Sequence, residues 1–487
     1  MKMIVIGLDG ASFDLIEPWL KAGKLPNLQG LIDNGVRGRL KSCLPPTTSP
    51  SWKCYSTGKN PGKLGIYWWE NIDFANRRIY IPTNRARTRE LWDCLSEKGL
   101  KAGVINMPMT YPPKQINGFM IAGGPDAPDR RFTYPRELES RLRNEFGYAV
   151  HPPVRSNWWR SGEAIKEVFA LIENRFKVAR TLAKEYELDF LHLTIFYINS
   201  LHHDLWNDKV VEQAWELLDR NIGALIDDFK GSNVIIMSDH GTNEINQVFY
   251  INTWLEKQGY LRTSGSLWFP RLLYRFGINE TRLFNIAQKL HLNNILKRIV
   301  PKRLRANIPS AIGTMELEQK ETKVVWEKSK ALASGQGPLY LASDNSGLQT
   351  EIINKLKKLT NPLTGRKIAQ QVYKREDIYR GDFLAEAPNI IIDQSPHTHI
   401  RGSIGNRNVF EEPKRWRAEN TTRGIFIASG PAFKQGVEVE NIAILDLTPT
   451  ILHLMGLPVP ADVDGRVLSE TFKKGSEPAK REVNRQE

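Results

Sequence analysis

Short apolar runs alternate with helical patterns along most of this chain. The apolar runs lie at residues 3–8, 101–106, 190–198, 234–237, 389–392 and 424–428. Between two of them, apolar side chains from Val210 to Phe229 recur at helical spacing, and Gly231 follows. Continuously apolar strands that alternate with helices are typical of parallel sheets covered on both faces. The sequence therefore predicts an α/β fold, with a doubly wound, mostly parallel sheet and helices on both faces.

Polar residues that can bind a metal follow several of these predicted strands. Asp9 comes directly after the first run, and Asp239 and His240 follow the run at 234–237. The run at 190–198 leads into a stretch that contains two adjacent histidines. In open α/β sheets, ligands bind at the carboxyl ends of the strands. We therefore expect a ligand site built from these side chains.

Thr48 lies where a helix is expected to begin. Pro45 and Pro46 interrupt the chain before it, and Pro50 occupies a position that the first turn of a helix tolerates. Free backbone N–H groups at such a helix entrance favour a phosphate. A threonine hydroxyl becomes a nucleophile only with a base or a divalent metal. The carboxylates and imidazole described above would hold that metal, so Thr48 is the candidate nucleophile.

The composition is that of a folded protein. Of the 487 residues, 41% are hydrophobic and 25% are charged, which argues against disordered and fibrous classes. No apolar run approaches the roughly 20 residues that span a bilayer, and no cleavable apolar leader is recognised, so we expect a cytoplasmic protein. The three cysteines, Cys43, Cys54 and Cys94, lack metal-type spacing and predict neither a disulfide framework nor a thiolate zinc site.

The alternation of strands and helices is interrupted in the second half of the chain. Residues 255–375 are expected to form an inserted cap that is basic and helical. The core would then consist of residues 1–254, with a helical insertion at about 110–180, and of residues 376–470. Residues 471–487 are polar and charged, and a disordered tail is expected there.

Positive charge is concentrated in the predicted cap. The net charge of the chain is +14, and residues 262–305 contain ten Lys or Arg against one acid, Glu280. Such a segment could contact a membrane surface or nucleic acid, but a solvated face of a helical insertion is the favoured interpretation. The positive charge is compatible with an anionic substrate, and no specific binding of nucleic acid is expected.

Five motifs in a fixed order carry a family resemblance. They are Val-Ile-Gly-Leu-Asp-Gly at 5–10, Gly-Lys-Leu-Pro-Asn-Leu at 23–28, Thr-Gly-Lys-Asn-Pro-Gly at 57–62, Ser-Asp-His-Gly at 238–241, and Asp-Leu-Thr-Pro-Thr at 446–450, which leads to Gly-Leu-Pro-Val-Pro at 456–460. The chain resembles the type I phosphodiesterase / nucleotide pyrophosphatase family of the alkaline phosphatase superfamily up to about Leu468. The resemblance implies an alkaline-phosphatase-like fold and a metal-dependent hydrolase.

The resemblance also implies a metal site and a nucleophile. In the family, one metal is held by an early Asp, by the nucleophile and by an Asp-His pair, which match Asp9, Thr48, Asp239 and His240. Taken singly, each residue has a structural interpretation, as a turn cap, a helix cap or a histidine near the core. Taken together, two carboxylates and an alkoxide would neutralise a divalent cation, and zinc, or else manganese, is expected.

The second metal site of the family is altered in this chain. Its Asp and two His ligands correspond to Asn199, His203 and Asn420. An amide oxygen carries no charge, and zinc and manganese sites rely on imidazole and carboxylate. We therefore expect one tightly bound ion and a weak or empty second site. Residues that could compensate are His202, Asp204, His397 and His399.

Three functions follow from this set of residues. The favoured one is hydrolysis of a phosphodiester or pyrophosphate bond, in which Thr48 attacks phosphorus and water releases the phosphoryl group. A one-metal transferase that passes the group to an alcohol would use the same residues. A catalytically impaired binding protein of the same fold is the third possibility.

Overall fold

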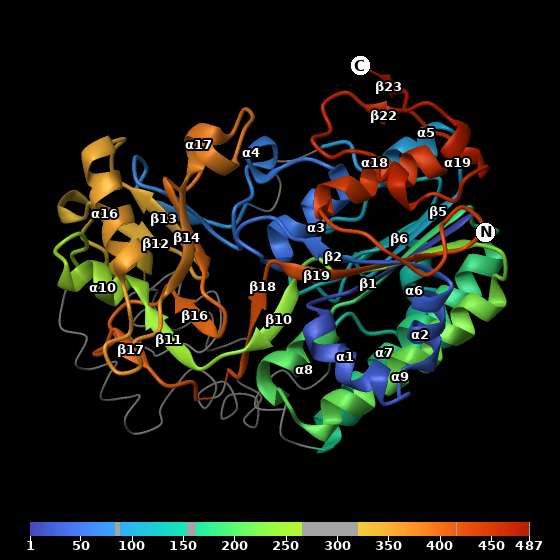
Figure 1. The fold of residues 1–487 in the computed structure, drawn as a ribbon, viewed down its shortest axis with the longest axis horizontal. Helices are drawn as coiled ribbons and strands as arrows, with labels where there is room; N and C mark the ends of the chain where they lie inside the picture. Colours follow the sequence, from blue (N-terminus) through green and yellow to red (C-terminus); the bar gives the residue numbers. More distant parts are fainter. Residues whose placement is uncertain (83–87, 153–161, 265–319, 415, 487) are drawn as a thin grey trace.

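One large sheet organises the fold (Figure 1). The computed structural model describes residues 1–82, 88–152, 162–264, 320–414 and 416–486. The strand order is β20-β2-β19-β9-β1-β8-β5-β6-β7, and β21 also pairs with β2. The strands are β1 (Met3–Leu8), β2 (Gly35–Lys41), β5 (Ala102–Ile105), β6 (Gly118–Ile121), β7 (Thr133–Tyr134), β8 (Phe190–Ile195), β9 (Asn233–Met237), β19 (Arg423–Ser429), β20 (Val437–Glu438) and β21 (Ile442–Ala443).

The central strands of this sheet are parallel, as predicted. β1 pairs in parallel with β8 and β9, and β5 pairs in parallel with β8 and β6. β19 runs antiparallel between β9 and β2. Along β1, Ile4 and Ile6 pack into the hydrophobic cluster on one face, whereas Met3 and Val5 pack into the cluster on the other. Successive side chains of a strand point to opposite faces, so a strand covered on both faces is apolar throughout.

Helices cover both faces of the sheet (Figure 1). One face carries α1 (Phe13–Lys21), α2 (Pro26–Asp33), α7 (Gly162–Glu185), α8 (Tyr197–Leu205) and α9 (Lys209–Asp228), and the other carries α3 (Thr48–Thr57), α5 (Leu91–Glu97) and α18 (Leu447–Leu454). In α9, Val211, Trp215, Leu218 and Ile222 recur about one turn apart and are buried. Within the described ranges, no helix combines the length and the apolar composition needed to cross a bilayer.

A second group of strands lies beside the main sheet (Figure 1). We call the elements from β11 to β17 the inserted unit. It contains an antiparallel sheet in the order β12-β13-β15-β14 and a smaller sheet in the order β16-β11-β17. Its elements are β11 (Gln247–Tyr250), α10 (Ile251–Lys257), β12 (Ala331–Ala333), β13 (Pro338–Leu341), α16 (Ser346–Lys358), β14 (Ala369–Lys374), α17 (Arg375–Ile378), β15 (Ile390–Gln394), β16 (Thr398–Arg401) and β17 (Phe410–Glu411).

The inserted unit differs from the predicted helical cap at 255–375. Its described part is built on an antiparallel sheet, and that sheet continues to the end of β15. The run at 389–392 was expected as a strand of the core, but Ile390 and Ile392 pack into the separate hydrophobic cluster of the inserted unit. A short apolar run has the same sequence pattern in a strand of either sheet, so periodicity does not show which sheet the strand joins. All but the first three residues of the basic segment at 262–305 lie outside the described residues.

Two smaller regions also differ from expectation. The predicted helical insertion at 110–180 contains β6 and β7 as well as α6 (Glu137–Phe146) and most of α7. The predicted disordered tail at 471–487 contains α19 (Glu477–Lys480) and β23 (Arg485–Gln486), which pairs with β22 (Val459–Pro460). His453 is hydrogen-bonded to the carbonyl of Pro478 at 2.9 Å, and Arg481 donates to the carbonyl of His453 at 2.5 Å. These directed bonds order a segment that has little apolar surface.

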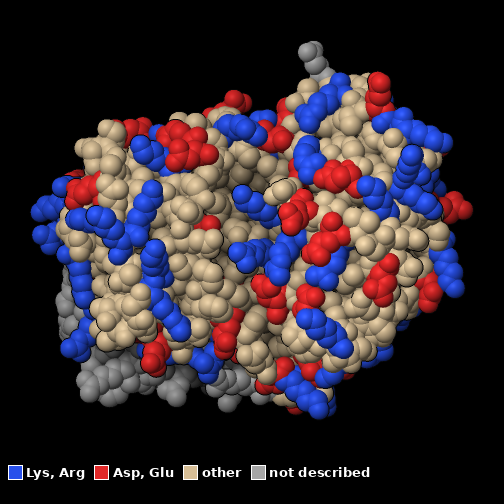
Figure 2. All heavy atoms as spheres, in the orientation of Figure 1, with Lys and Arg blue, Asp and Glu red and all other residues tan. Residues whose placement is uncertain are grey.

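Charged side chains are distributed over the whole face shown in Figure 2. Lys and Arg side chains occur over both the core and the inserted unit, and Asp and Glu side chains are interspersed among them. On this face, therefore, the described residues do not form one large basic patch.

Candidate active site

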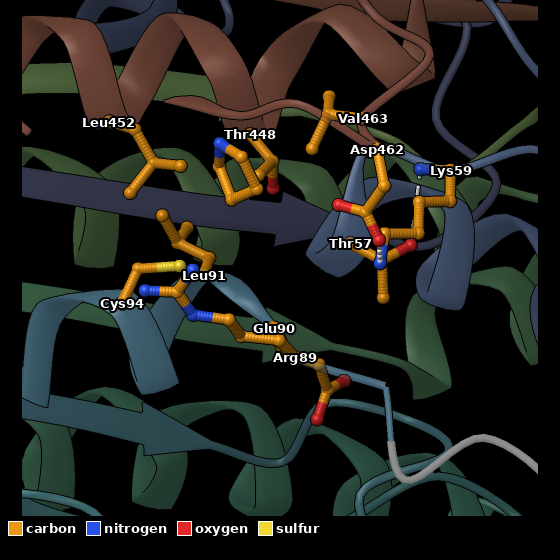
Figure 3. A pocket seen from close by; sticks show the side chains of 11 residues that line it. Thr57, Lys59, Arg89, Glu90, Leu91, Cys94, Thr448, Leu452, Asp462 and Val463 are labelled. Atoms are coloured by element: carbon orange, nitrogen blue, oxygen red, sulfur yellow. Dashed lines mark hydrogen bonds and ion pairs between the residues drawn. The ribbon is translucent and has the colours of Figure 1, made fainter. Parts of the chain in front are cut away.

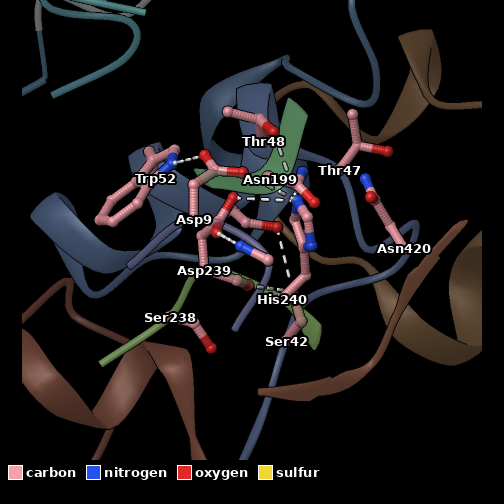
Figure 4. Close-up of polar contacts among 12 residues, drawn as sticks. Asp9, Ser42, Thr47, Thr48, Trp52, Asn199, Ser238, Asp239, His240 and Asn420 are labelled. Carbon is pink, nitrogen blue, oxygen red and sulfur yellow. Dashed lines mark hydrogen bonds and ion pairs between the residues drawn. The ribbon is translucent and has the colours of Figure 1, made fainter. Parts of the chain in front are cut away.

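Asp9, Thr48, Asp239 and His240 meet at the carboxyl edge of the central strands (Figure 4). Asp9 follows β1, while Asp239 and His240 follow β9, the parallel neighbour of β1. Thr48 is the first residue of α3, so the predicted helix entrance is present. Neighbouring parallel strands end at the same edge of a sheet. This topology brings together residues from three distant parts of the chain.

The geometry of this group fits a cation. Oγ1 of Thr48 lies 3.3 Å from Nε2 of His240, and the same Nε2 lies 3.6 Å from Oδ1 of Asp9 and 3.2 Å from Oδ2 of Asp239. Those two buried carboxylate oxygens have no hydrogen-bond partner among the residues that the structure describes. Unpaired buried charge is costly. Because ligand atoms of Asp9, Asp239 and His240 all lie within 4.8 Å of one another, one ion between them would satisfy both carboxylates.

Burial controls the protonation of these ligands in the protein alone. Burial raises the pKa of Asp9 to about 7, against smaller lowering effects of hydrogen bonds from Trp52 and Asn199. Burial, and then the charge of Asp9, raises the pKa of Asp239 well above its ordinary value. Burial lowers the pKa of His240 to about 3. Without a metal, these pKa values favour protonated carboxyl groups. A divalent cation would favour their charged forms instead, so the donor set suits a divalent metal.

Trp52 orients the carboxylate of Asp9. Its Nε1 donates to Oδ2 of Asp9 at 3.0 Å, which leaves Oδ1 facing His240. Trp52 lies four residues after Thr48, and residues at that spacing share one face of a helix. The sequence interpretation missed Trp52, although this spacing from the candidate nucleophile was a usable signal.

Backbone groups orient the two other ligands. The N–H of Gly10 donates to Oδ1 of Asp239 at 3.3 Å, which leaves Oδ2 unused. Nδ1 of His240 lies 2.9 Å from the carbonyl oxygen of Gly241. Since a carbonyl only accepts, Nδ1 carries the proton and Nε2 presents its lone pair beside Thr48. Each ligand is therefore held with a free donor atom directed at the same point.

The first turn of α3 presents free backbone N–H groups beside Thr48. Thr47 is the residue before the helix, and its side chain makes no capping hydrogen bond. Pro50, at the third helical position, has no N–H to be capped. In the described part of the chain, the backbone amides of Thr48 and Ser49 have no acceptor. Such amides bind phosphate-type anions.

Asn199 does not present its oxygen to a second metal. It lies on α8, and its Oδ1 accepts a hydrogen bond from Oγ1 of Thr242 at 3.1 Å. The amide of Asn199 also lowers the pKa of Asp9, against the larger effect of burial. Because only a donor favours the charged form of a carboxylate, the NH₂ group of Asn199 faces Asp9. Asn199 therefore supports the first site as a donor.

His203 and Asn420 provide two neutral acceptors near this site. Nδ1 of His203 donates to the carbonyl of Ala418 at 2.7 Å, and its ring stacks on Trp416 with centroids 4.0 Å apart. Asn420 belongs to β18 (Ala418–Thr421), which pairs with β10 (Gly241–Glu244). Its Oδ1 is buried and has no partner among the described residues. In Figure 4, Asn420 and Thr47 lie on the opposite side of His240 from Asp9.

Three of the residues considered for compensation have other partners. Nε2 of His202 accepts a hydrogen bond from Trp215 at 3.0 Å. His397 is exposed, and its Nδ1 donates to the carbonyl of Glu244 at 2.7 Å. His399 forms an ion pair with Glu419.

Glu419 is the centre of a buried polar network that the sequence interpretation did not find. Besides His399, it accepts hydrogen bonds from Nε2 of Gln336 at 2.5 Å and from the backbone N–H of Asn420 at 2.8 Å. Burial is the largest single effect and raises the pKa of Glu419, but the charge and hydrogen bond of His399, the charge of His203 and the N–H of Asn420 together lower it to about 2. Its partners come from separate stretches of the chain, so no local pattern indicated them.

A small hollow lies at the opposite end of α3 from Thr48 (Figure 3). Its lining includes Thr57 at the end of α3, Glu90 and Thr448, and Lys59 pairs with Asp462 there. Its volume is about 10 Å³, the space of one water molecule. The hollow is too small for a substrate.

Comparison with known families decides where this chain belongs. The model of the type I phosphodiesterase / nucleotide pyrophosphatase family matches residues 3–420. The chain is a member of that family. It is a hydrolytic enzyme of the alkaline phosphatase superfamily, in a metal-dependent family that acts on small phosphoester substrates. No curated protein matches the chain.

A solved structure shows the same fold as this phosphodiesterase-family member. It is the phosphonoacetate hydrolase from Sinorhizobium meliloti 1021 in complex with phosphonoformate. The match has a TM-score of 0.58 at 13% identity and covers 92% of this chain and 94% of that chain. The likeness confirms the predicted alkaline-phosphatase-like α/β architecture.

Proposed function

We propose that this enzyme hydrolyses phosphodiester or pyrophosphate bonds, with Thr48 as the nucleophile and one tightly bound zinc or manganese ion. The carrying observation is the position of the Thr48 hydroxyl, 3.3 Å from Nε2 of His240. Beside it lie the two carboxylate oxygens, of Asp9 and Asp239, that lack partners among the described residues. This arrangement supports a metal held by Asp9, Asp239, His240 and Thr48.

The reaction then follows in two displacements. A bound metal would lower the pKa of the Thr48 hydroxyl and offset the charge of the phosphoryl oxygens. The Thr48 hydroxyl loses its proton to solvent and Oγ1 attacks phosphorus, the bond from phosphorus to the leaving oxygen breaks, and the leaving group departs as an alcohol or, from a pyrophosphate, as a phosphate. The backbone amides of Thr48 and Ser49 donate to a phosphoryl oxygen and stabilise its charge. Water then attacks the phosphorus of the esterified phosphothreonine, the bond to Oγ1 breaks, Oγ1 regains a proton, and a phosphomonoester leaves.

A single tight metal site is supported by the residues at the family's second position. The oxygen of Asn199 already accepts from Thr242, and His203 and Asn420 add only neutral donors. These residues fit a second divalent ion poorly. A single metal site also suits transfer to an acceptor alcohol, which is the second candidate function. Transfer would use the same residues, and only the group that attacks in the second step would differ. The retained set of four ligands argues against a purely binding role.

The expected setting is a cytoplasmic enzyme acting on a small phosphodiester or nucleotide-like molecule. The three cysteines are free thiols in the structure, which is compatible with a reducing compartment. Contact of the basic segment at 262–305 with a membrane surface is not part of the proposal.

Hydrolysis of bis(4-nitrophenyl) phosphate with added zinc or manganese tests the nucleophile. Thr48→Ala should lower kcat by several orders of magnitude, because only charge stabilisation and binding remain when the attacking hydroxyl is removed. Thr48→Ser, which keeps a hydroxyl, should retain part of the rate. Equal rates for the parent and Thr48→Ala would reject Thr48 as the nucleophile. Adding ethylene glycol and measuring its phosphoester product would separate transfer from hydrolysis.

Elemental analysis after dialysis tests the number of ions. One zinc or manganese ion per chain is expected. Two equally retained ions would contradict the interpretation of Asn199, His203 and Asn420.

A further inference from the structure

Gln336 reaches from the inserted unit to the entrance of the nucleophile helix. It lies in the turn between β12 and β13 and is buried. Its Oε1 accepts hydrogen bonds from Oγ1 of Thr47 and from Nε1 of Trp68, the latter at 3.0 Å. Thr47 directly precedes Thr48, so this contact links the inserted unit to the residue next to the nucleophile.

The amide of Gln336 has only one orientation that satisfies its partners. Its Nε2 donates to Oε1 of Glu419 at 2.5 Å, and a carboxylate cannot donate in return. Its oxygen must therefore face Thr47 and Trp68. Glu419 is itself held by His399 and by the backbone of Asn420. Glu419 therefore fixes the amide of Gln336 and with it the position of the Gln336 oxygen.

The turn that carries Gln336 packs closely against Trp68. Gln336 has φ +57°, a left-handed conformation that non-glycine residues rarely adopt and that persists where surroundings enforce it. A Cβ on Gly335 would lie 2.7 Å from the ring of Trp68, so only glycine fits there. The side chain of Asn252 bonds both the N–H and the carbonyl of Ala333 at 2.9 and 2.8 Å. The contacts with Trp68 place the turn against the core, and the bonds from Asn252 fix the turn within the inserted unit.

Without Gln336, Thr47 would be a suitable cap for α3. Its backbone is extended, with φ −126° and ψ 140°, as in residues that cap helices, and threonine is a preferred capping residue. A capping oxygen accepts from the second or third helical N–H. The third residue is Pro50, which has none, so a capping Thr47 would occupy the N–H of Ser49. A hydroxyl can donate and accept at once, but in the structure the Thr47 oxygen is held at Gln336 and accepts no capping bond, so α3 is left uncapped.

We propose that Gln336 is a positioning residue that keeps Thr47 from capping α3 and thereby leaves the Ser49 amide available to the phosphoryl oxygen. The inference rests on the proposed function, since it assumes that a phosphoryl group binds at the entrance of α3. It assigns the inserted unit a part in catalysis, through the hydroxyl of Thr47.

The test is a pair of substitutions assayed with bis(4-nitrophenyl) phosphate. Gln336→Met keeps the length of the side chain but removes the acceptor, and kcat should fall about tenfold as the Thr47 hydroxyl competes for a phosphate-binding amide. Thr47→Val keeps the branched shape but removes that hydroxyl. The double variant should therefore regain kcat to within about threefold of Thr47→Val alone, and inhibition by inorganic phosphate should weaken and recover in parallel.

Controls separate this role from a structural one. Gln394→Met removes another buried glutamine of the inserted unit, which bonds the carbonyl of Asn420 at 3.0 Å, and Thr47→Val should not improve that variant. Gln336→Asn is a second variant for the case in which Gln336→Met folds poorly. Asparagine suits the left-handed backbone but is too short to reach Thr47, so it should lower kcat in the same way.

The inference is overturned if the double variant is no faster than Gln336→Met, or if Gln336→Met and Gln336→Asn both match the parent. In either case the parent would still be faster than Thr48→Ala, and the proposed function would stand. A parent no faster than Thr48→Ala overturns the function and the inference together.

Discussion

Single residues at this site act through the oxygen or nitrogen atom that they leave free. In Asp9 and Asp239, one carboxylate oxygen is occupied by a protein donor and the other is unpaired among the described residues. In His240, the bond from Nδ1 leaves Nε2 available. Because donor atoms fixed in this way lose little freedom on binding, they favour a metal more than the same residues on mobile chains would.

Trp52→Phe should weaken metal binding. The substitution removes the hydrogen bond that holds Asp9, and loss of such a supporting contact commonly costs 10- to 100-fold in metal affinity. Isothermal titration calorimetry of the metal-free protein with zinc measures the metal affinity. Trp92→Phe is the matched control, since Trp92 is also buried but its Nε1 has no partner among the described residues. Equal affinities in the two variants would contradict the role given to Trp52.

Restoring the family's ligands should restore a second ion. Asn199→Asp alone replaces an NH₂ donor with a third carboxylate beside Asp9, so the metal-free variant should melt at a lower temperature than the parent. Combined with Asn420→His, it supplies a carboxylate and a second imidazole next to His203. Elemental analysis of the double variant should then approach two ions per chain. A value that stays at one would show that these substitutions are not the reason for a single site.

At the scale of elements, two segments meet at Thr48, the proposed nucleophile. Helix α3 presents Thr48 and Trp52 to His240 and Asp9 from the core side. Strand β18 presents Asn420 and the buried Glu419, which ties the turn between β12 and β13 to the site. Because β18 pairs with β10 directly after His240, a shift of β18 would be transmitted to the ligands.

Glu419 should make stability depend on acid pH. Its pKa is lowered from 4.5 to about 2, so its contribution is fully present above about pH 4.5 and is lost as pH falls toward 2. The shift corresponds to roughly 3 kcal/mol. The groups that face it are His399, His203, Gln336 and Trp416. Melting temperatures of the parent and Glu419→Gln should differ most near neutral pH and converge below pH 4.5, and a constant gap would contradict the assignment.

For the whole molecule, the site lies where the carboxyl edge of the main sheet meets the inserted unit. The core supplies every ligand of the proposed metal, and the inserted unit supplies Gln336 and His399. The two parts have separate hydrophobic clusters, so polar contacts at the site connect parts that are packed independently.

Metal removal should destabilise the molecule. A ligand that binds only the folded state adds about 4 kcal/mol at a thousand times its dissociation constant, so EDTA should lower the melting temperature by a few degrees and zinc or manganese should restore it. Asp239→Asn should abolish the response. Asp393→Asn is the control, because Asp393 lies on β15 of the inserted unit, away from the ligand set. A melting temperature insensitive to EDTA would contradict a structural contribution of the metal.

Local patterns were sufficient to choose the candidate residues that the structure brings together. The apolar runs before Asp9 and Asp239 predicted buried strands, and a residue directly after a parallel strand lies at the ligand-binding edge. The prolines around Thr48 predicted a helix entrance, which the structure shows. Trp52 could have been added from its helical spacing to Thr48.

The sequence by itself determined the strands, the family and the residues that can hold one metal, because these depend on neighbouring residues and on motif order. Only the tertiary structure decided that the run at 389–392 belongs to the inserted unit, that the oxygen of Asn199 is occupied by Thr242, and that the Thr47 hydroxyl bonds to Gln336. Those outcomes depend on which atoms of distant segments come within hydrogen-bonding distance. A one-dimensional pattern carries the type of each residue but not the direction in which its donor and acceptor atoms point.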